Sequence, residues 1–332
     1  MTELKDPQEF PVVRAAELPC SDVGPHWLIE GLWAWSGVGL IGGAPKSCKS
    51  WLGLDMALSV ASGTPCLGTF AVTLAGTALI YLAEDSAAVV RGRLAGLCRL
   101  RQVDFEQLPV DVITVPALRL DLERDQHRLA ETIRRLRPRL LLLDPFVRLQ
   151  RIDENSAAEV SSLLAYLREL QREYELAIIV VHHVRKSGPG GAQAGQALRG
   201  SGDFHAWGDS NLYLRRLRDG LALTIEHRAA PTPAPLMLSL LAGEEHAAPH
   251  LALAEAPPTL PAEQRAGELD ATVLKALQGA TEPVSRAYLR ATLRVRNESL
   301  GDALTRLAAA GQIVRHGDRW SLPPEPVPVP TP

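Results

Sequence analysis

Short apolar stretches alternate with longer amphipathic ones from about residue 38 to residue 181. The short stretches are rich in leucine, isoleucine and valine and span residues 38–41, 77–83, 110–115, 140–143 and 176–181. The stretches between them carry apolar residues at helical spacing, as residues 156–174 do with Leu163, Leu164, Leu167 and Leu170. Buried strands that alternate with amphipathic helices predict an α/β domain with a mainly parallel sheet.

The pattern changes after residue 184. Residues 185–202 are rich in glycine and poor in apolar side chains, and strand-like stretches return at 210–215, 221–226 and 236–240. Their close spacing predicts an antiparallel extension of the sheet. Prolines recur between residues 231 and 261, which predicts that the later part of this region is a stiff, polar linker.

A different pattern begins near residue 267. Three helical stretches follow one another, and Ser285 and Asn297 are positioned to cap the second and third. Strand-like residues 312–316 and 319–322 then flank Gly317–Asp318, which is a two-residue turn signal. Three helices followed by a hairpin predict a small winged helix-turn-helix domain.

These patterns divide the chain into five parts. We expect an N-terminal arm at 1–26, an α/β domain at 27–240, a proline-rich linker at 241–265, a winged-helix domain at 266–322 and a disordered proline-rich tail at 323–332. Trp27 and Trp33 open the second part, and we interpret them as core or subunit contacts rather than as a stacking platform for bases.

Composition narrows the functional classes. The net charge is −3, so any surface for nucleic acid must be local. The four cysteines lack C-x-x-C spacing and no secretory segment precedes them, so we expect reduced thiols in the cytoplasm rather than a zinc site. No apolar run approaches the roughly 18 residues of a membrane span, so we expect no membrane contact.

A glycine-rich turn follows the first strand and leads into a helix at residues 49–62. It fits the phosphate-binding pattern G-x-x-x-x-G-K-[ST], except that a cysteine replaces the second glycine. The residues of this turn, which we expect to hold the phosphates of ATP, are Gly43, Ala44, Pro45, Lys46, Ser47, Cys48, Lys49 and Ser50. In such a turn the lysine reaches the β- and γ-phosphates and the serine hydroxyl ligates Mg²⁺. The cysteine makes tight binding of ATP less secure.

Carboxylates end two further strands. Asp144 follows four leucines, and we expect it to serve the Mg²⁺ shell. Glu84 follows residues 77–83 and is the candidate base that polarises the attacking water. Asp85 is the alternative base, or else the cap of the next helix.

The order of these motifs resembles a known family. The phosphate loop, Glu84–Asp85, Asp144–Pro145, His182–His183 and Arg199–Gly200–Ser201 follow one another as in the RecA-like ATPases of the RepA hexameric replicative helicase group. The resemblance covers about residues 27–226 and implies a RecA-like P-loop NTPase core. It also implies a homo-oligomer, a ring of six subunits with ATP between neighbours, and translocation on single-stranded DNA.

The resemblance assigns roles to individual residues. It implies that Lys49, Ser50 and Asp144 hold ATP and Mg²⁺, that Glu84 activates water and that His183 senses the γ-phosphate. The two adjacent histidines could otherwise form a metal pair, but no third ligand is evident.

The trans-acting arginine of this family has no clear counterpart. Asp209 stands near its expected position, and Arg199, Arg215 and Arg216 remain as rival candidates. Arg199 could equally hold a loop, and the other two could be solvated strand residues.

Two loops resemble those that line the DNA channel of such rings. The first offers Arg148 and Arg151 and the second offers Arg185 and Lys186, although both could be ordinary surface loops. The winged-helix domain would add contact with duplex DNA or with a protein. Its candidate phosphate-contacting residues are Arg286, Arg290, Arg294, Arg296, Arg315 and Arg319.

Three functional hypotheses follow. The first is an ATP-hydrolysing, ring-forming DNA translocase or helicase. The second is an ATP-switched DNA-binding or assembly protein that acts in replication initiation, regulation or defence without unwinding. The third is a RecA-like scaffold that has lost hydrolysis.

Overall fold

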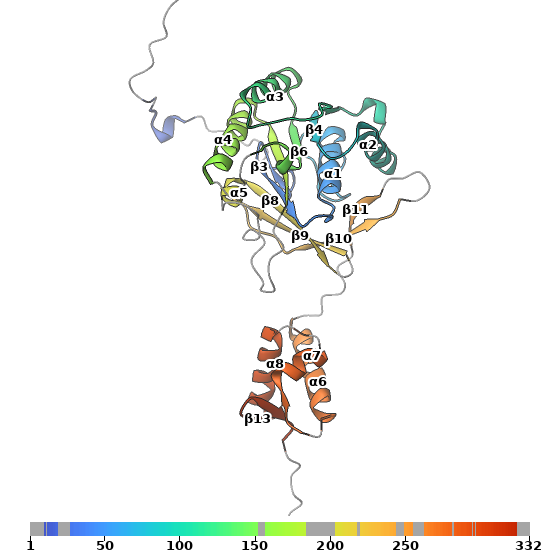
Figure 1. Cartoon of the computed structure of the whole chain (residues 1–332), viewed down its shortest axis with the longest axis vertical. Coiled ribbons are helices and arrows are strands. Elements are labelled where there is room, and N and C mark those ends of the chain that lie inside the picture. The colour runs from blue at the N-terminus through green and yellow to red at the C-terminus, as the bar shows by residue number, and fades with distance from the viewer. Residues whose placement is uncertain are drawn as a thin grey trace, which may run out of the picture. The chain divides into compact units, whose positions relative to one another are not determined.

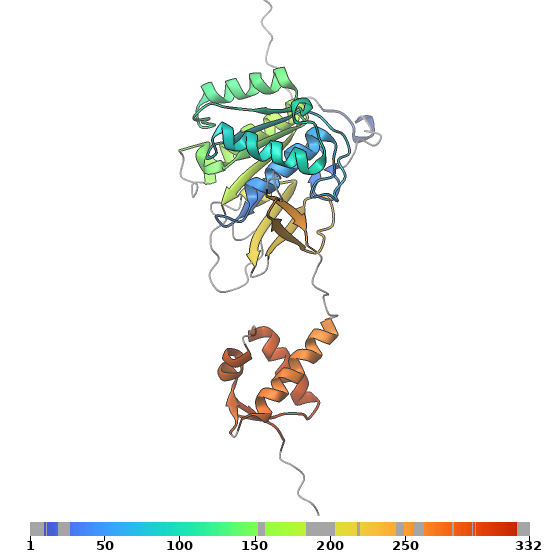
Figure 2. The ribbon, with the colours of Figure 1, turned by 90° about the vertical axis from the view of Figure 1, so that its right-hand side faces the viewer.

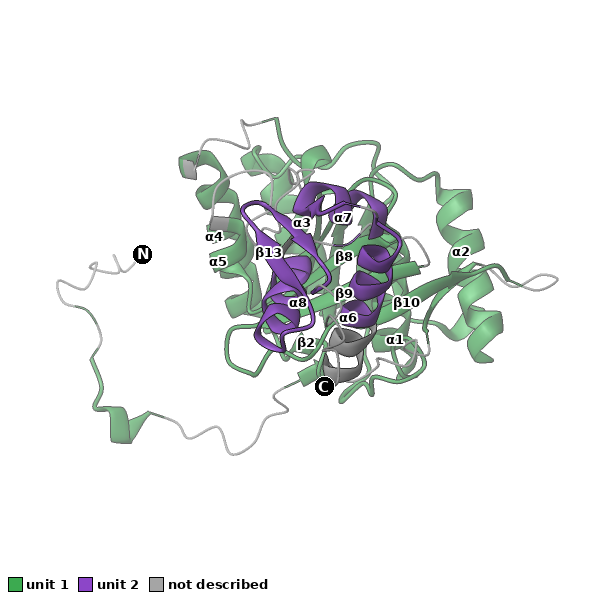
Figure 3. Cartoon of the chain, turned by 90° about the horizontal axis from the view of Figure 1, so that it is seen from below, with its two compact units in different colours: residues 1–255 green, residues 256–332 purple. Residues whose placement is uncertain are grey.

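The computed structural model describes residues 10, 12–18, 27–151, 157–183, 203–217, 220–243, 249–254, 262–280, 282–293, 295 and 297–323. The chain splits into two compact units, Met1–Glu255 and Ala256–Pro332, which are coloured green and purple in Figure 3. In the arm, the described residues include one 3-10 turn, η1 (Ala15–Glu17).

The first unit is built on a sheet that is nine-stranded in the described part of the chain. Its strands, in chain order, are β3 (Val38–Gly43), β4 (Ala78–Leu82), β5 (Val110–Val112), β6 (Leu140–Asp144), β7 (Ala177–His183), β8 (Ser210–Leu217), β9 (Gly220–His227), β10 (Leu236–Leu241) and β11 (His250–Leu253). Their order across the sheet is β11-β10-β9-β8-β3-β7-β6-β4-β5. The pairs from β8 to β5 are parallel and those from β8 to β11 are antiparallel. This large, mainly parallel sheet in a mixed α/β unit fits the RecA-like core expected from the sequence.

Helices cover both faces of the sheet (Figure 1). They are α1 (Lys49–Ser62), α2 (Ala87–Arg101), α3 (Glu123–Leu136), α4 (Ala157–Tyr174) and the short α5 (Asp203–Trp207). Apolar residues of α1 and α2 pack in one cluster, and those of α3 and α4 pack in a second cluster with the opposite side chains of the strands. Local signals mark the helix ends: the Ser86 hydroxyl accepts a hydrogen bond from the Val89 amide, and α1 ends at Gly63 with φ 74°.

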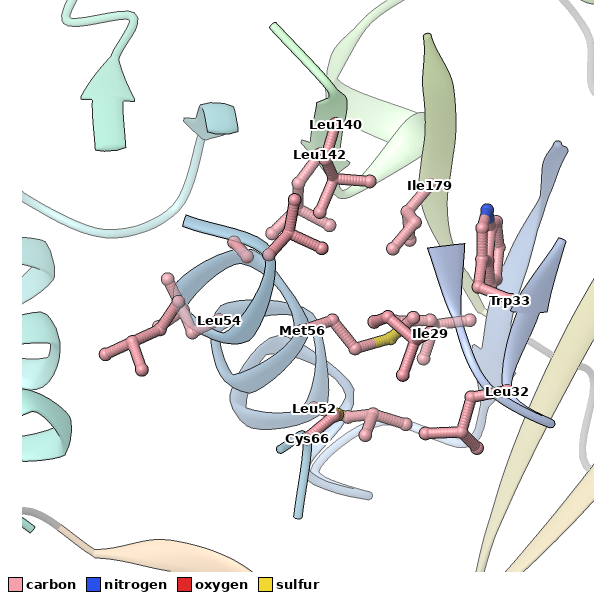
Figure 4. Close-up of a cluster of buried hydrophobic side chains, with 14 of the residues drawn as sticks. Ile29, Leu32, Trp33, Leu52, Leu54, Met56, Cys66, Leu140, Leu142 and Ile179 are labelled. Carbon is pink, nitrogen blue, oxygen red and sulfur yellow. The ribbon is translucent and has the colours of Figure 1, made fainter. Parts of the chain in front are cut away.

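The helix α1 is more deeply buried than α2, the other helix of the first cluster. Figure 4 shows its side chains Leu52 and Met56 on the side of the short strands β1 (Trp27–Ile29) and β2 (Trp33–Ala34), and Leu54 on the opposite side. Leu52 and Met56 are fully buried, and burial of each such side chain contributes roughly 1.5–3 kcal/mol. A Cβ at Gly53 would lie 3.0 Å from a methyl group of Leu142, so α1 sits directly against β6. This packing holds the start of α1 beside the end of β6.

The expected linker is partly structured. Within residues 241–265, His250–Leu253 forms β11 and pairs with β10, as the orange strands at the edge of the sheet in Figure 2 show. The helix α6 (Ala262–Gln278) also begins inside the expected linker. The prolines therefore interrupt secondary structure without excluding it, and the first unit extends beyond residue 240.

The described residues of the second unit form three helices and a small sheet. Its elements are α6, β12 (Val284–Ser285), α7 (Arg286–Leu293), α8 (Asn297–Ala309), β13 (Val314–His316) and β14 (Arg319–Ser321). The strands form an antiparallel sheet of order β12-β14-β13. His316 pairs with Arg319, which leaves Gly317–Asp318 as the predicted two-residue turn, and the Ser285 hydroxyl caps α7 by accepting from the Tyr288 amide.

Among the described residues, no helix is both long enough and apolar enough to cross a membrane.

Candidate nucleotide site

The carboxyl ends of β3, β4, β6 and β7 meet at one edge of the sheet, where α1 begins. A cavity of about 430 Å³ opens there. Its lining includes most of the site residues expected from the sequence, namely Lys46, Ser47, Cys48, Lys49, Ser50, Glu84, Asp144 and His183, whereas Gly43, Ala44 and Pro45 are not part of it. Segments more than 130 residues apart in the chain therefore share one cavity, which is the usual place for a ligand in a parallel α/β sheet.

The Lys49 ammonium is held at the floor of the phosphate loop. Its Nζ atom donates to the carbonyl oxygens of Gly43, at 3.0 Å, and Ala44, at 2.9 Å. Burial lowers the pKa of Lys49, and the Asp144 carboxylate opposes this shift. The lysine is thus a buried cation whose hydrogen bonds go to neutral carbonyl oxygens, which suits a site for phosphate.

Cys48 stands where the phosphate-binding pattern has its second glycine, and its backbone conformation is one that glycine adopts without strain. Its φ is 65° and its ψ 23°, a left-handed conformation that costs a residue with a Cβ about 1–2 kcal/mol. Burial raises the pKa of the Cys48 thiol, although the nearby cations Arg216 and Lys49 oppose this. The loop therefore keeps the expected backbone turn despite the cysteine.

Asp144 is a buried carboxylate at the end of β6. Burial raises its pKa to about 6, against the hydrogen bond from the Ser50 hydroxyl and the charge of Lys49, which lower it. A divalent cation placed between Ser50 and Asp144 would favour the ionised carboxylate, because opposite charge lowers a carboxyl pKa. The donor set of hydroxyl and carboxylate oxygens is the kind that Mg²⁺ prefers.

The phosphate loop also has the shape that a phosphate site requires. A Cβ at Gly43 would lie 2.6 Å from both the Leu214 carbonyl and the Ser47 hydroxyl, so only glycine fits there. The Ser47 hydroxyl is buried without a hydrogen-bond partner among the described residues. The buried donor, the cation and the oxygen ligands together fit ATP and Mg²⁺.

Glu84 and Asp85 have different environments. Glu84 is half-exposed, and its Oε1 lies 3.0 Å from the Nε of Arg148. Asp85 instead forms a 2.5 Å ion pair with Arg93 of α2. Ser86, not Asp85, supplies the helix cap. The Asp85 carboxylate is therefore paired with a residue of α2, whereas Arg148, the partner of Glu84, is exposed.

The two histidines of β7 lie on opposite faces of the strand. His183 lines the cavity. His182 is buried on the other face, where its ring stacks on Phe204 at 4.5 Å and meets Phe146 edge-on at 5.9 Å. Since neighbouring strand residues point in opposite directions, the pair cannot chelate one ion. The described residues hold no group of three or more metal-ligating side chains.

The basic residues that the sequence offered as a trans-acting arginine or as DNA contacts differ in their outcome. Arg199, Arg185 and Lys186 lie outside the described residues. Arg215 is exposed on β8. Arg216 lines the cavity of its own chain and donates to the Lys46 carbonyl at 3.0 Å.

Sequence reasoning missed several residues that line the cavity. They are Trp51, Leu82, Arg93, Pro145 and Leu240. Arg93 lies over the Trp51 ring, 5.1 Å from its centroid, as well as pairing with Asp85. The spacing of Asp85 and Arg93, two helical turns apart, was a usable signal, but nothing local in β10 indicates that Leu240 reaches this site.

No curated protein matches the chain. Among solved structures, the crystal structure of the RadB recombinase is 16% identical, with a TM-score of 0.49, over 66% of this chain and 91% of that one. A second solved structure is described as that of a DnaB-like replicative helicase and its interactions with primase. Its chain is 15% identical to this one, with a TM-score of 0.49, over 65% of this chain and 57% of that one.

The family comparison covers the strands and loops of the cavity as far as β7. The family model described as an AAA domain matches residues 4–189. That range contains the phosphate loop, Glu84, Asp144 and His183 and is more than half of the 332 residues. The chain therefore belongs to the AAA domain family of P-loop ATPases.

Proposed function

We propose that this protein is an ATP-hydrolysing, ring-forming translocase or helicase of the RepA-like type that acts on single-stranded DNA in the cytoplasm. The observation that carries the proposal is the single cavity lined by Lys49, Ser50, Glu84, Asp144 and His183. A site that only bound nucleotide would not need a strand-end glutamate beside the magnesium ligands.

Each side chain has a distinct task in this proposal. The Lys49 ammonium binds the β- and γ-phosphates, and Ser50 and Asp144 hold Mg²⁺, which neutralises charge that develops on the phosphates. The Glu84 carboxylate orients the attacking water and takes its proton. His183, at the end of β7, contacts the γ-phosphate and senses its loss.

The proposed contact with DNA lies beside Glu84, the proposed general base. Arg148 and Arg151 follow β6, and both are exposed. Positive side chains at this edge can neutralise DNA phosphates without reading bases. The contact between Arg148 and Glu84 supports a link between the two functions, because DNA phosphates would compete with Glu84 for the arginine.

We further propose that the second unit is a winged helix-turn-helix domain that contacts duplex DNA or a partner protein. Three helices with a terminal hairpin support this assignment. Arg290 on α7 and Arg315 and Arg319 on the hairpin are exposed. Arg286 is also exposed, and it lies against α8, since its Nη2 would be 2.4 Å from a Cβ at Gly301. Arg294 and Arg296 lie outside the described residues.

The decisive experiment compares Glu84→Gln with Asp85→Asn and a surface control, Glu106→Gln. Magnesium-dependent phosphate release, with and without single-stranded DNA, is measured for all three variants and the wild type. We expect Glu84→Gln to bind ATP and hardly turn it over, while Glu106→Gln matches the wild type. Hydrolysis by Glu84→Gln at the wild-type rate would contradict the assignment and make Asp85 the base.

A second candidate function is the ATP-switched DNA-binding or assembly protein without unwinding. The ion pair between Glu84 and Arg148 favours it, because a base held by an arginine suits a protein whose turnover stays low until a partner binds. Strand displacement separates the two: unwinding of a forked duplex supports the helicase, and tight ATP-dependent DNA binding without unwinding supports the switch. A negative-stain image with ATP and single-stranded DNA tests ring formation.

The cysteine supports the third candidate, a scaffold without hydrolysis. Cys48 occupies a strained, left-handed conformation in the phosphate loop. Absence of phosphate release from a wild type that binds ATP would favour this scaffold over both other functions.

A further inference from the structure

The strand β8 carries two adjacent arginines past the end of β3. Gly43 pairs with Leu214 in the parallel register of the two strands, so Arg215 and Arg216 extend alongside the phosphate loop. Successive side chains of a strand point to opposite faces. Leu212 and Leu214 belong to the cluster that contains α1, whereas Tyr213 belongs to the cluster on the other face. Arg216 therefore points to the face of α1, and Arg215 points away from it.

The contacts of Arg216 agree with this alternation. Its Nη2 donates to the Lys46 carbonyl inside the phosphate loop, and its side chain lines the cavity. A guanidinium has five N–H donors, so its bonds to this carbonyl and to the Cys48 thiol leave donors for a further acceptor. Among the described residues, Arg216 forms no ion pair with a carboxylate, whereas Arg93, which shares the cavity, is paired with Asp85.

We propose that Arg216 binds the phosphates of the nucleotide held by its own subunit, and that Arg215 does not. This inference rests on the proposed nucleotide site. It changes the choice of trans-acting arginine, because a side chain bonded to its own phosphate loop is not free to reach a neighbouring subunit. Arg215 and Arg199 remain as candidates for that role.

The test is equilibrium binding of MgATP by calorimetry to the full chain, at a concentration where sedimentation shows single chains. We expect Arg216→Ala to weaken binding roughly tenfold or more, as loss of a charge-assisted hydrogen bond predicts. Arg216→Lys should recover part of the affinity because it restores the charge without the planar fork. Arg215→Ala is the matched control, from the same strand and also exposed. It should bind within about twofold of the wild type, because single chains offer this arginine no neighbouring site.

Thermal unfolding without nucleotide checks that the variants are folded. Wild-type affinity in a folded Arg216→Ala variant would overturn this inference and leave the nucleotide site intact. A wild type that binds no nucleotide would overturn both, so the two failures are distinguishable.

Subunit mixing gives a second, independent readout. Arg216→Ala chains, which keep Lys49, are mixed with Lys49→Ala chains, which keep Arg216. If Arg216 acts within its own subunit, no mixed pair contains a complete site and hydrolysis stays at the level of the separate variants. Recovery of hydrolysis on mixing would show that Arg216 acts across the interface and would overturn the proposal.

Discussion

Replacing Asp144 with asparagine should stabilise the nucleotide-free protein at neutral pH while it removes ATP turnover. Burial raises the pKa of Asp144 from 3.8 to about 6. This value already includes the effects of the Ser50 hydrogen bond and the Lys49 charge, which lower the pKa. The gap is about two pH units, and one unit corresponds to about 1.4 kcal/mol. The buried charge therefore costs about 3 kcal/mol of folding free energy at pH 7, which asparagine avoids at nearly the same size.

The sign of the pH dependence follows from the direction of the shift. Because the folded pKa lies above the unfolded one, the folded protein binds more protons than the unfolded chain between about pH 4 and pH 6. The contribution of Asp144 to the free energy of unfolding of the wild type therefore falls as the pH rises through that window, and it is constant above it. Other titrating groups are shared by both proteins, so the stability difference between them should grow from near zero at pH 4 to about 3 kcal/mol at pH 7.

The assay is thermal unfolding of both proteins in EDTA at several pH values. For a unit of about this size, 1 kcal/mol shifts Tm by roughly 2–4 °C, so we expect the variant to melt roughly 6–12 °C higher at pH 7. The control is Asp111→Asn, an exposed carboxylate on β5, which should change stability by about 0.5 kcal/mol or less. A variant that is less stable than the wild type at pH 7, or a difference that does not grow with pH, would refute the reasoning. Saturating MgATP should reduce or reverse the difference, because only the wild-type carboxylate holds the metal.

Other substitutions test separate parts of the molecule. Cys48→Gly should keep or raise the affinity for ATP, since glycine adopts the left-handed turn without strain, and a tenfold loss in calorimetry would show that the thiol is itself a binding element. Arg148→Ala should raise DNA-independent phosphate release and weaken single-strand binding in fluorescence anisotropy, because an exposed pair of this kind holds Glu84 by about 1 kcal/mol or less; unchanged basal release would mean that the ion pair has no regulatory effect. Asp55→Ala should destabilise the protein by about 3–5 kcal/mol in urea unfolding, since it leaves the Arg101 guanidinium buried without its carboxylate, and a loss below about 1 kcal/mol would contradict this view of the pair. A truncation after residue 260 should keep ATP-dependent, salt-sensitive single-strand binding and lose duplex affinity; duplex binding that survives the truncation would remove the proposed role of the winged helix.

Local signals in the sequence determined most of the elements and the kinds of residue at the site. Apolar stretches followed by Glu84, Asp144 and His183 predicted strands that end at a common edge, and β4, β6 and β7 confirm those strands. The Gly317–Asp318 turn and the Ser285 cap were equally readable, because turns and caps depend on side chains within a few residues. The phosphate loop was recognisable for the same reason.

Only the tertiary structure decided which groups meet. The strand β11 forms inside an expected linker because its backbone pairs with the edge of β10, and no pattern within residues 241–265 predicts that pairing. The Asp144 pKa depends on burial beneath elements from other parts of the chain. Arg148 reaches Glu84 across 64 residues, and Arg216 reaches Lys46 across 170. Secondary structure follows from interactions between near neighbours in the chain, whereas charge pairing and the choice between two adjacent arginines depend on strand register and on which face of the sheet each side chain occupies.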